Sequence, residues 1–183
     1  MNKKKILKEL LNTGLYLLFV LAAAWLLSNY VVQRTPVVGS SMESTLSDGD
    51  NLFMDKISYR FRDPERFDII IFPFQYEEDT YYIKRIIGLP GETVQIDTSG
   101  NIYIDGEILQ ESYGREVIKP EKVGRAAQPV VLGEDEYFVM GDNRNNSSDS
   151  RTEAVGNIHR NDIVGRAWIR IWPLNKLRFL NHQ

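Results

Sequence analysis

An uncharged, largely apolar stretch near the N-terminus limits most strongly what this chain can fold into. No charged residue lies between Glu9 and Arg34, and the central stretch L-Y-L-L-F-V-L-A-A-A-W-L-L (15–27) is wholly apolar. As a helix rising about 1.5 Å per residue, these 24 uncharged residues would measure about 36 Å. That length exceeds the ~30 Å hydrocarbon core of a bilayer. The stretch therefore predicts one transmembrane helix, which we assign to residues 14–33.

Residues at the two ends of this stretch predict its orientation. Four of the first eight residues are lysines, and such a basic flank favours the cytoplasmic side of a membrane. Tyr16 near one end, with Trp25 and Tyr30 near the other, is typical of aromatic side chains at membrane interfaces. We therefore expect a single-pass protein of the cell membrane, with residues 1–13 cytoplasmic and residues 34–183 extracytoplasmic.

Two other interpretations of the apolar stretch are open. A cleaved signal peptide also has a basic start, an apolar segment and small residues such as Ala22-Ala23-Ala24. The apolar run continues past these alanines to Val32, however, which favours an uncleaved anchor. A buried core helix fits less well, because no polar face interrupts residues 15–27.

Composition excludes several classes of site. The chain has 183 residues and 43% hydrophobic residues, enough for one domain with its own core. It has no cysteine, so disulfides, Cys-based metal sites and a thiol nucleophile are excluded. The net charge of −3 gives no reason to expect nucleic acid as a partner. No pattern in the sequence requires a metal or a cofactor, and we expect none.

After Arg34 the pattern is that of β-strands. Short runs rich in β-branched and aromatic residues are separated by turn signals such as Pro90-Gly91 and Ser99-Gly100. Asp105-Gly106 predicts a tight hairpin. The sequence thus predicts a mainly β, antiparallel domain over 34–183, with the weakly patterned segment 108–134 as a surface excursion or subdomain. The predicted strands lie within 67–74, 81–88, 93–96, 101–104, 137–140 and 162–172.

The stretch V-G-S-S-M-E-S-T-L-S (38–47) is either a solvated linker or the site of a nucleophilic hydroxyl. A serine nucleophile normally needs a base. The two histidines are poor candidates, because His159 lies in a polar, turn-like segment and His182 is next to the C-terminus.

Lys84 is a better candidate for the base. Strand alternation places Tyr82, Lys84 and Ile86 on one face. Burial there would lower the pKa of the lysine toward neutrality and make its amine a general base. The alternative is a structural lysine that extends its amine to solvent.

A third stretch, G-D-N-R-N-N-S-S-D-S-R (141–151), is almost entirely polar. A calcium loop is rejected, because Arg144 replaces a ligand and Ser147 replaces the turn glycine. Glycosylation sequons at Asn145 and Asn146 are weak signals. The stretch is either a flexible loop or a buried network in which alternating Asp and Arg side chains hold the loop in place.

Four segments together resemble a known family. The segments G-S-S-M-E-S-T-L, R-F-D-I-I-I-F, Y-I-K-R-I-I-G-L-P-G-E and G-D-N-R-N-N-S-S-D-S-R resemble, in this order, the conserved boxes of bacterial type I signal peptidases. The resemblance implies a mainly β serine protease of the signal-peptidase type behind one membrane anchor. Such an enzyme removes N-terminal signal peptides from secreted preproteins with a Ser–Lys dyad, after small residues at −1 and −3. Its partners would be secretory preproteins and the lipid bilayer.

The resemblance also implies roles for individual residues. Ser41 corresponds to the nucleophile, Lys84 to its base, and Ser147 to a hydroxyl that orients the lysine. The oxyanion would be bound by the Ser41 backbone N–H, since Gly39 offers no side-chain donor. The corresponding charged network is Asp142, Arg144, Asp149 and Arg151, and the corresponding walls of shallow substrate pockets are Val37, Val38, Met42, Leu46, Tyr82 and Ile83.

One departure from the family pattern leaves alternatives. Ser44 stands where the family usually has proline, and it is a second candidate hydroxyl.

A self-cleaving Ser–Lys repressor is a related enzyme class, but it carries a DNA-binding helical domain where this chain has an apolar span. A membrane-tethered β binding module without activity is the non-enzymatic alternative, which the presence of Ser41, Lys84 and Ser147 together disfavours.

Overall fold

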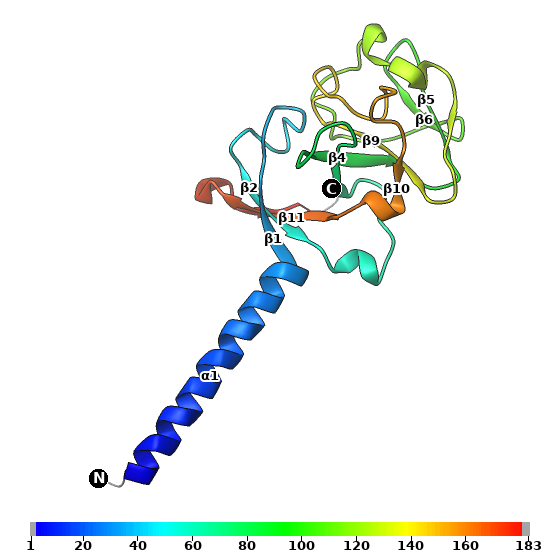
Figure 1. The fold of residues 1–183 in the computed structure, drawn as a ribbon. Coiled ribbons are helices and arrows are strands. Elements are labelled where there is room, and N and C mark those ends of the chain that lie inside the picture. The colour runs from blue at the N-terminus through cyan, green and yellow to red at the C-terminus, as the bar shows by residue number, and fades with distance from the viewer. Residues whose placement is uncertain (1–2, 181–183) are drawn as a thin grey trace.

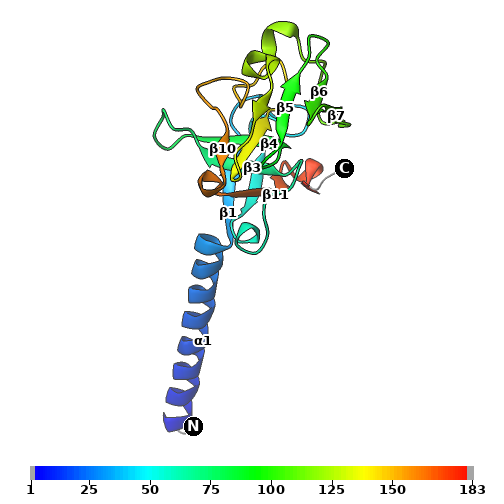
Figure 2. The same cartoon turned by 90° about the vertical axis from the view of Figure 1, so that its right-hand side faces the viewer.

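The computed structural model describes residues 3–180 as one long helix followed by a β domain (Figure 1). The helix projects away from the domain, so the first turn of α1 and the strands lie at opposite ends of the molecule (Figures 1 and 2). The elements in chain order are α1 (Lys3–Tyr30), β1 (Val32–Pro36), β2 (Asn51–Asp55), η1 (Ser58–Arg60), β3 (Ile69–Pro73), β4 (Tyr81–Gly88), β5 (Thr93–Ile96), β6 (Ile102–Ile104), β7 (Glu107–Ile108), η2 (Pro120–Lys122), η3 (Gly124–Ala127), β8 (Val130–Val131), β9 (Glu136–Met140), β10 (Ile158–His159), η4 (Arg160–Asp162), β11 (Gly165–Trp172), η5 (Leu174–Lys176) and β12 (Arg178–Phe179).

Helix α1 contains the apolar stretch. Its segment Lys4–Leu27 is long and apolar enough to cross a membrane by length and composition, and none of it is buried against the rest of the protein. The helix bounds differ from the predicted 14–33 at both ends. The lysine-rich start continues the helix because lysine, leucine and glutamate are good helix formers. At the other end, Val32 and Gln33 leave the helix because they pair with Asp55 and Met54 of β2.

The β domain consists of two antiparallel sheets, which confirms the predicted mainly β, antiparallel fold. The larger sheet has the order β1-β2-β11-β3-β4-β9-β10, with β12 pairing with β11. The smaller sheet has the order β7-β6-β5-β8, and Asp105-Gly106 forms the hairpin between β6 and β7. Residues 108–134 supply β8 and the 3₁₀ turns η2 and η3, so they form part of this smaller sheet and its cover together with β5 to β7.

Three apolar clusters lie between these elements. One cluster fills the space under the smaller sheet, and another packs around Phe72 and Val139. The third includes Met42, Leu46 and Ile71, and it lies where β1, β2 and β3 meet the loop that follows β1. This third cluster supports the loop that contains Ser41.

Candidate active site

Ser41 lies in the loop between β1 and β2. The loop is anchored by Met42 and Leu46, which are almost fully buried and whose backbones are joined by a hydrogen bond from the Leu46 N–H to the Met42 carbonyl. Arg170 and Arg178 of the C-terminal strands both donate to the Thr45 carbonyl at 3.1 Å. These contacts fix the loop while leaving Ser41 partly exposed.

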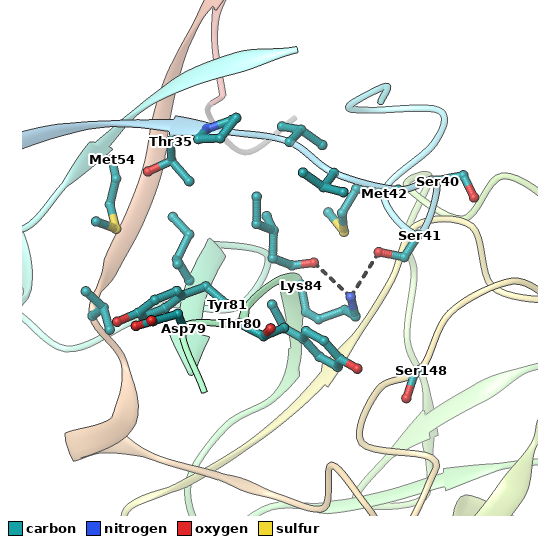
Figure 3. A pocket seen from close by; sticks show the side chains of 18 of the residues that line it. Thr35, Ser40, Ser41, Met42, Met54, Asp79, Thr80, Tyr81, Lys84 and Ser148 are labelled. Atoms are coloured by element: carbon teal, nitrogen blue, oxygen red, sulfur yellow. Dashed lines mark hydrogen bonds between the residues drawn. The ribbon is translucent and has the colours of Figure 1, made fainter. Parts of the chain in front are cut away.

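Lys84 reaches Ser41 from strand β4. Its Nζ donates to Ser41 Oγ at 2.9 Å and to the Ile83 carbonyl at 3.2 Å (Figure 3). It also lies 4.7 Å from the centre of the Tyr82 ring, which confirms that Tyr82 and Lys84 share a face of the strand. Ser41 and Lys84 are 43 residues apart in the chain, and the fold brings them into direct contact.

The environment of Lys84 lowers its basicity. The side chain is only 4% exposed. Burial lowers the pKa of the amine from 10.5 to about 8, against the opposing effect of the carboxylates of Asp149 and Asp142. A substantial fraction of the amines is therefore neutral at mildly alkaline pH, and a neutral amine at 2.9 Å is able to accept the Ser41 hydroxyl proton.

The polar stretch 141–151 is an ordered loop that holds the backbone around Ser41. The Asn143 N–H donates to the Ser41 carbonyl, and its side-chain amide donates to the Ser40 carbonyl, both at 3.0 Å. Asn146 Nδ2 donates to Ser40 Oγ at 2.9 Å. Asn143 and Asn146 are absent from the predicted site residues, although both lie within the stretch singled out in the sequence.

Ion pairs under this loop fix it in place. Asp142 is paired with Arg85 through two hydrogen bonds of 2.8 and 2.7 Å, and all the atoms of this pair are nearly inaccessible. Asp149 is paired in the same two-bond manner with Arg151, at 2.8 Å each, and also accepts from the Gly141 N–H at 3.0 Å. Because buried charges are costly unless paired, the Arg85–Asp142 pair ties the loop to β4, and the Asp149–Arg151 pair holds the loop in its own shape.

The four predicted network residues are thus all buried, but two of their partners are absent from the prediction. Arg85 follows Lys84 directly within an apolar strand, which was a visible signal of a buried cation. Glu111 pairs with Arg144 at 2.6 Å and lies in a segment with no motif of its own, so no sequence signal pointed to it.

Gly141 allows this loop to approach Ser41. A Cβ atom at this position would lie 2.5 Å from the Ser41 carbonyl oxygen and 2.3 Å from Ser147 Oγ. Both distances are too short for real contacts. A side chain at position 141 would therefore separate the polar loop 141–151 from the loop that contains Ser41.

Ser147 has a different environment from the one expected. Its Oγ is buried and has no hydrogen-bond partner within residues 3–180, whereas the resemblance implies a bond with the Lys84 amine. The orienting role of Ser147 stays a prediction. The neighbouring Ser148, which was not predicted, lines the cavity together with Asn146.

The other candidate catalytic groups lie elsewhere. Ser44 is exposed, and no contact joins it to Lys84 in the described part of the chain. His159 is about half exposed on β10, next to the carboxylates of Asp135 and Glu136, and it does not line the cavity. His182 lies outside the described residues.

A cavity of about 770 Å³ opens beside Ser41 and Lys84 (Figure 3). Leu46 does not line it, contrary to prediction, because its side chain is fully buried in the core below the loop. The other five residues predicted for the substrate pockets, Val37, Val38, Met42, Tyr82 and Ile83, all line the cavity.

Within residues 3–180, no group of three or more His, Asp or Glu side chains could hold a metal ion.

Comparison with known proteins gives a consistent result. Residues 10–172 match the family described as signal peptidase, peptidase S26. The chain is 40% identical over 157 residues to the probable signal peptidase I-2 of Synechocystis sp., covering 82% of this chain and 68% of the relative. It is 36% identical over 186 residues to signal peptidase I T of Bacillus subtilis, covering 97% of this chain and 95% of the relative.

Two further matches are a curated relative and a solved structure. Signal peptidase I P of Bacillus subtilis subsp. natto is 34% identical over 186 residues, covering 97% of this chain and 98% of the relative. The crystal structure of a signal peptidase I from Enterococcus faecalis V583 is 35% identical, with a TM-score of 0.47, and the match covers 57% of this chain and 97% of that chain.

Proposed function

This chain belongs to the signal peptidase family, peptidase S26, and removes signal peptides from preproteins; we propose that it does so with Ser41 as nucleophile and Lys84 as general base. The observation that carries this proposal is the 2.9 Å contact between Lys84 Nζ and Ser41 Oγ beside an open cavity. The direct test is incubation of the detergent-solubilised full chain with a secretory precursor, with the masses of both products measured. Intact precursor after prolonged incubation would contradict the function.

The two side chains account for both halves of the reaction. Neutral Lys84 takes the hydroxyl proton of Ser41 as Oγ attacks the carbonyl carbon of substrate residue −1. The resulting ammonium gives its proton to the departing amine of the mature protein, which leaves an ester on Ser41. Lys84 then takes a proton from a water molecule that attacks this ester, and the proton returns to Ser41 Oγ when the signal peptide leaves.

The negative charge of the tetrahedral intermediate needs hydrogen-bond donors. We assign this role to the Ser41 backbone N–H, which donates to no other group in the described part of the chain. Preorganised donors of this kind stabilise the transition state because they need no rearrangement as charge develops. The bonds from Asn143 to the Ser40 and Ser41 carbonyls support the same backbone, and Asn146 donates to the Ser40 hydroxyl beside it.

The strands around the cavity favour an extended substrate. Strand β1 is at the edge of the larger sheet. The start of β4 pairs with β3 on one side only, because β9 pairs with the other side of β4 only from Arg85 onward. An extended peptide lying between β1 and the start of β4 would find unpaired backbone groups on both sides. Its side chains would alternate, with −1 and −3 pointing into the enzyme and −2 pointing away.

The cut is therefore expected to follow small residues at −1 and −3, as in A-x-A. A precursor series with Ala, Val and Phe at −1 should lose cleavage steeply, because large side chains overlap the wall formed by Val37, Met42 and Ile83. The same series at −2 should change the rate little. Initial rates for both series measure the difference, and equal tolerance at the two positions would refute the docking mode.

Helix α1 supplies the proposed membrane anchor. Its exposed apolar segment matches the bilayer thickness, and the lysines before it favour a cytoplasmic N-terminus. The catalytic domain would then lie outside the cytoplasm, and the apolar segment of a signal peptide would lie in the bilayer beside α1.

Protease treatment of cells stripped of their wall tests this orientation. The protease should digest the chain after Arg34 and leave the N-terminal segment intact, because the bilayer shields the latter. A cytoplasmic marker protein that stays intact is the control for lysis. Protection of the β domain, with the marker intact, would contradict the orientation.

A further inference from the structure

The cavity extends well beyond the Ser–Lys pair along strand β1. Beyond Val37 it is lined by Thr35 and by the apolar side chains of Met54, Ile71 and Val164, and Gln33 and Lys56 also line it. Figure 3 shows the side chain of Thr35, which carries a hydroxyl, directed from β1 into the cavity. Thr35 Oγ1 is buried and has no hydrogen-bond partner within the described residues. A buried hydroxyl without a partner is costly, so one is expected to be supplied when the cavity is filled.

The position of Thr35 along β1 relates it to one substrate residue. Strand alternation places the side chains of Val37 and Thr35 on the same face, separated by about 7 Å. An extended substrate beside β1 has the same spacing, so its −1 and −3 side chains are also about 7 Å apart. When the carbonyl of substrate residue −1 lies at Ser41 and its side chain lies next to Val37 and Ile83, the −3 side chain lies beside Thr35.

Resting on the proposed function, we propose that Thr35 sets a preference for a hydroxyl-bearing side chain, serine or threonine, at substrate position −3. The −3 hydroxyl exchanges a hydrogen bond with Thr35 Oγ1, which satisfies both groups when the substrate excludes water. The χ1 torsion of Thr35 has staggered wells, and rotation from one to another turns the hydroxyl toward the −3 side chain. A purely apolar side chain at −3 leaves the hydroxyl of Thr35 unpaired.

Replacement of threonine by the isosteric valine, both at −3 of the substrate and at position 35 of the enzyme, tests this inference. Two precursors that differ only by Thr or Val at −3, with Ala at −1, are cut by the full-length enzyme and by its Thr35→Val variant in detergent. The unsubstituted enzyme should cut the Thr precursor with a kcat/KM about fivefold higher, the effect of one net hydrogen bond. In Thr35→Val this preference should disappear or reverse, because the hydroxyl of the substrate then lacks its partner.

Two further variants keep the test informative if Thr35→Val folds poorly. Thr35→Ser retains the hydroxyl and should retain the preference, whereas Thr35→Ala should lose it. The matched control is a precursor pair with Ala or Ser at −1, whose ratio should be the same in all four enzymes. This control separates a local change at −3 from a general loss of activity.

The possible outcomes separate the two proposals. Cleavage with the same Thr-to-Val ratio in the unsubstituted enzyme and in Thr35→Val would overturn the role of Thr35 and leave the proposed function intact. The same result would follow if water, and not substrate, supplied the partner of Thr35. Failure of the unsubstituted enzyme to cut any precursor would overturn the proposed function, and the role of Thr35 with it.

Discussion

Replacement of Ser41 by alanine is expected to lower the rate of precursor cleavage by about a thousandfold or more, to the limit of detection. The reason is that Ser41 Oγ is the only hydroxyl in the described part of the chain that accepts a hydrogen bond from the buried Lys84 amine. Without this oxygen no covalent intermediate forms, and losses of this size are typical of nucleophile deletions. Cleavage is measured by the mass of the mature product over time.

Replacement of Lys84 should have an effect of similar size, because the two groups act as a unit. Lys84→Met is the sharper variant, since methionine fills most of the buried volume and avoids a cavity. The matched controls are Ser44→Ala and His159→Ala, which should retain most of the activity. Thermal unfolding of each variant shows whether the fold is kept.

Two outcomes would contradict this assignment. Undiminished cleavage by folded Ser41→Ala would remove Ser41 as nucleophile, and loss of cleavage in Ser44→Ala alone would move the role to Ser44.

Ser147→Ala is measured in the same cleavage assay. If Ser147 orients the lysine, its loss should lower kcat far more than it raises KM.

The second large effect is a dependence of kcat/KM on pH. Burial lowers the pKa of Lys84 to about 8, and only the neutral amine serves as a base. The rate should therefore rise about tenfold per pH unit below that value and level off above it. At about pH 6 roughly 1% of the lysines are neutral, so the rate should be about a hundredfold below its plateau.

The direction of the pH dependence follows from the base. With lysine as the base, the rate falls as the pH falls, because protonation removes the lone pair that accepts the Ser41 proton. Circular dichroism across the same pH range controls for unfolding, and a precursor without titratable groups near the cut controls for the substrate. A flat profile from about pH 6 to about pH 9 would exclude Lys84 as the base.

Much of the β domain follows from local pattern. The alternation and the turn residues predict strands over 81–88 and 93–96, and the structure has strands with these bounds. Strands β1 and β2 are absent from the prediction. The segment V-Q-R-T-P is polar on one side and directly follows the apolar run, so its β structure comes from pairing with β2 rather than from its own pattern.

The pairing of charges likewise depends partly on local pattern and partly on tertiary contacts. The sequence places Asp142 and Asp149 in one polar stretch, and their alternation with arginines predicts a network. The partner of Asp142, however, is Arg85, 57 residues earlier, and the partner of Arg144 is Glu111. The contact between Arg85 and Asp142 depends on the register of β4 against β9, and no local pattern encodes it.

By itself the sequence predicted the apolar span and the antiparallel β character, because both depend on residues that are adjacent or regularly spaced, whereas it pointed to the Ser41–Lys84 pair only through its resemblance to a family. Only the tertiary structure decided that Leu46 belongs to the core, that the Ser147 hydroxyl has no hydrogen-bond partner among the described residues, and that the hydroxyl of Thr35 lies beside the cavity. These facts depend on how distant strands pack on one another. Close packing in three dimensions sets whether a side chain faces the interior or a cavity, and spacing along one strand leaves both open.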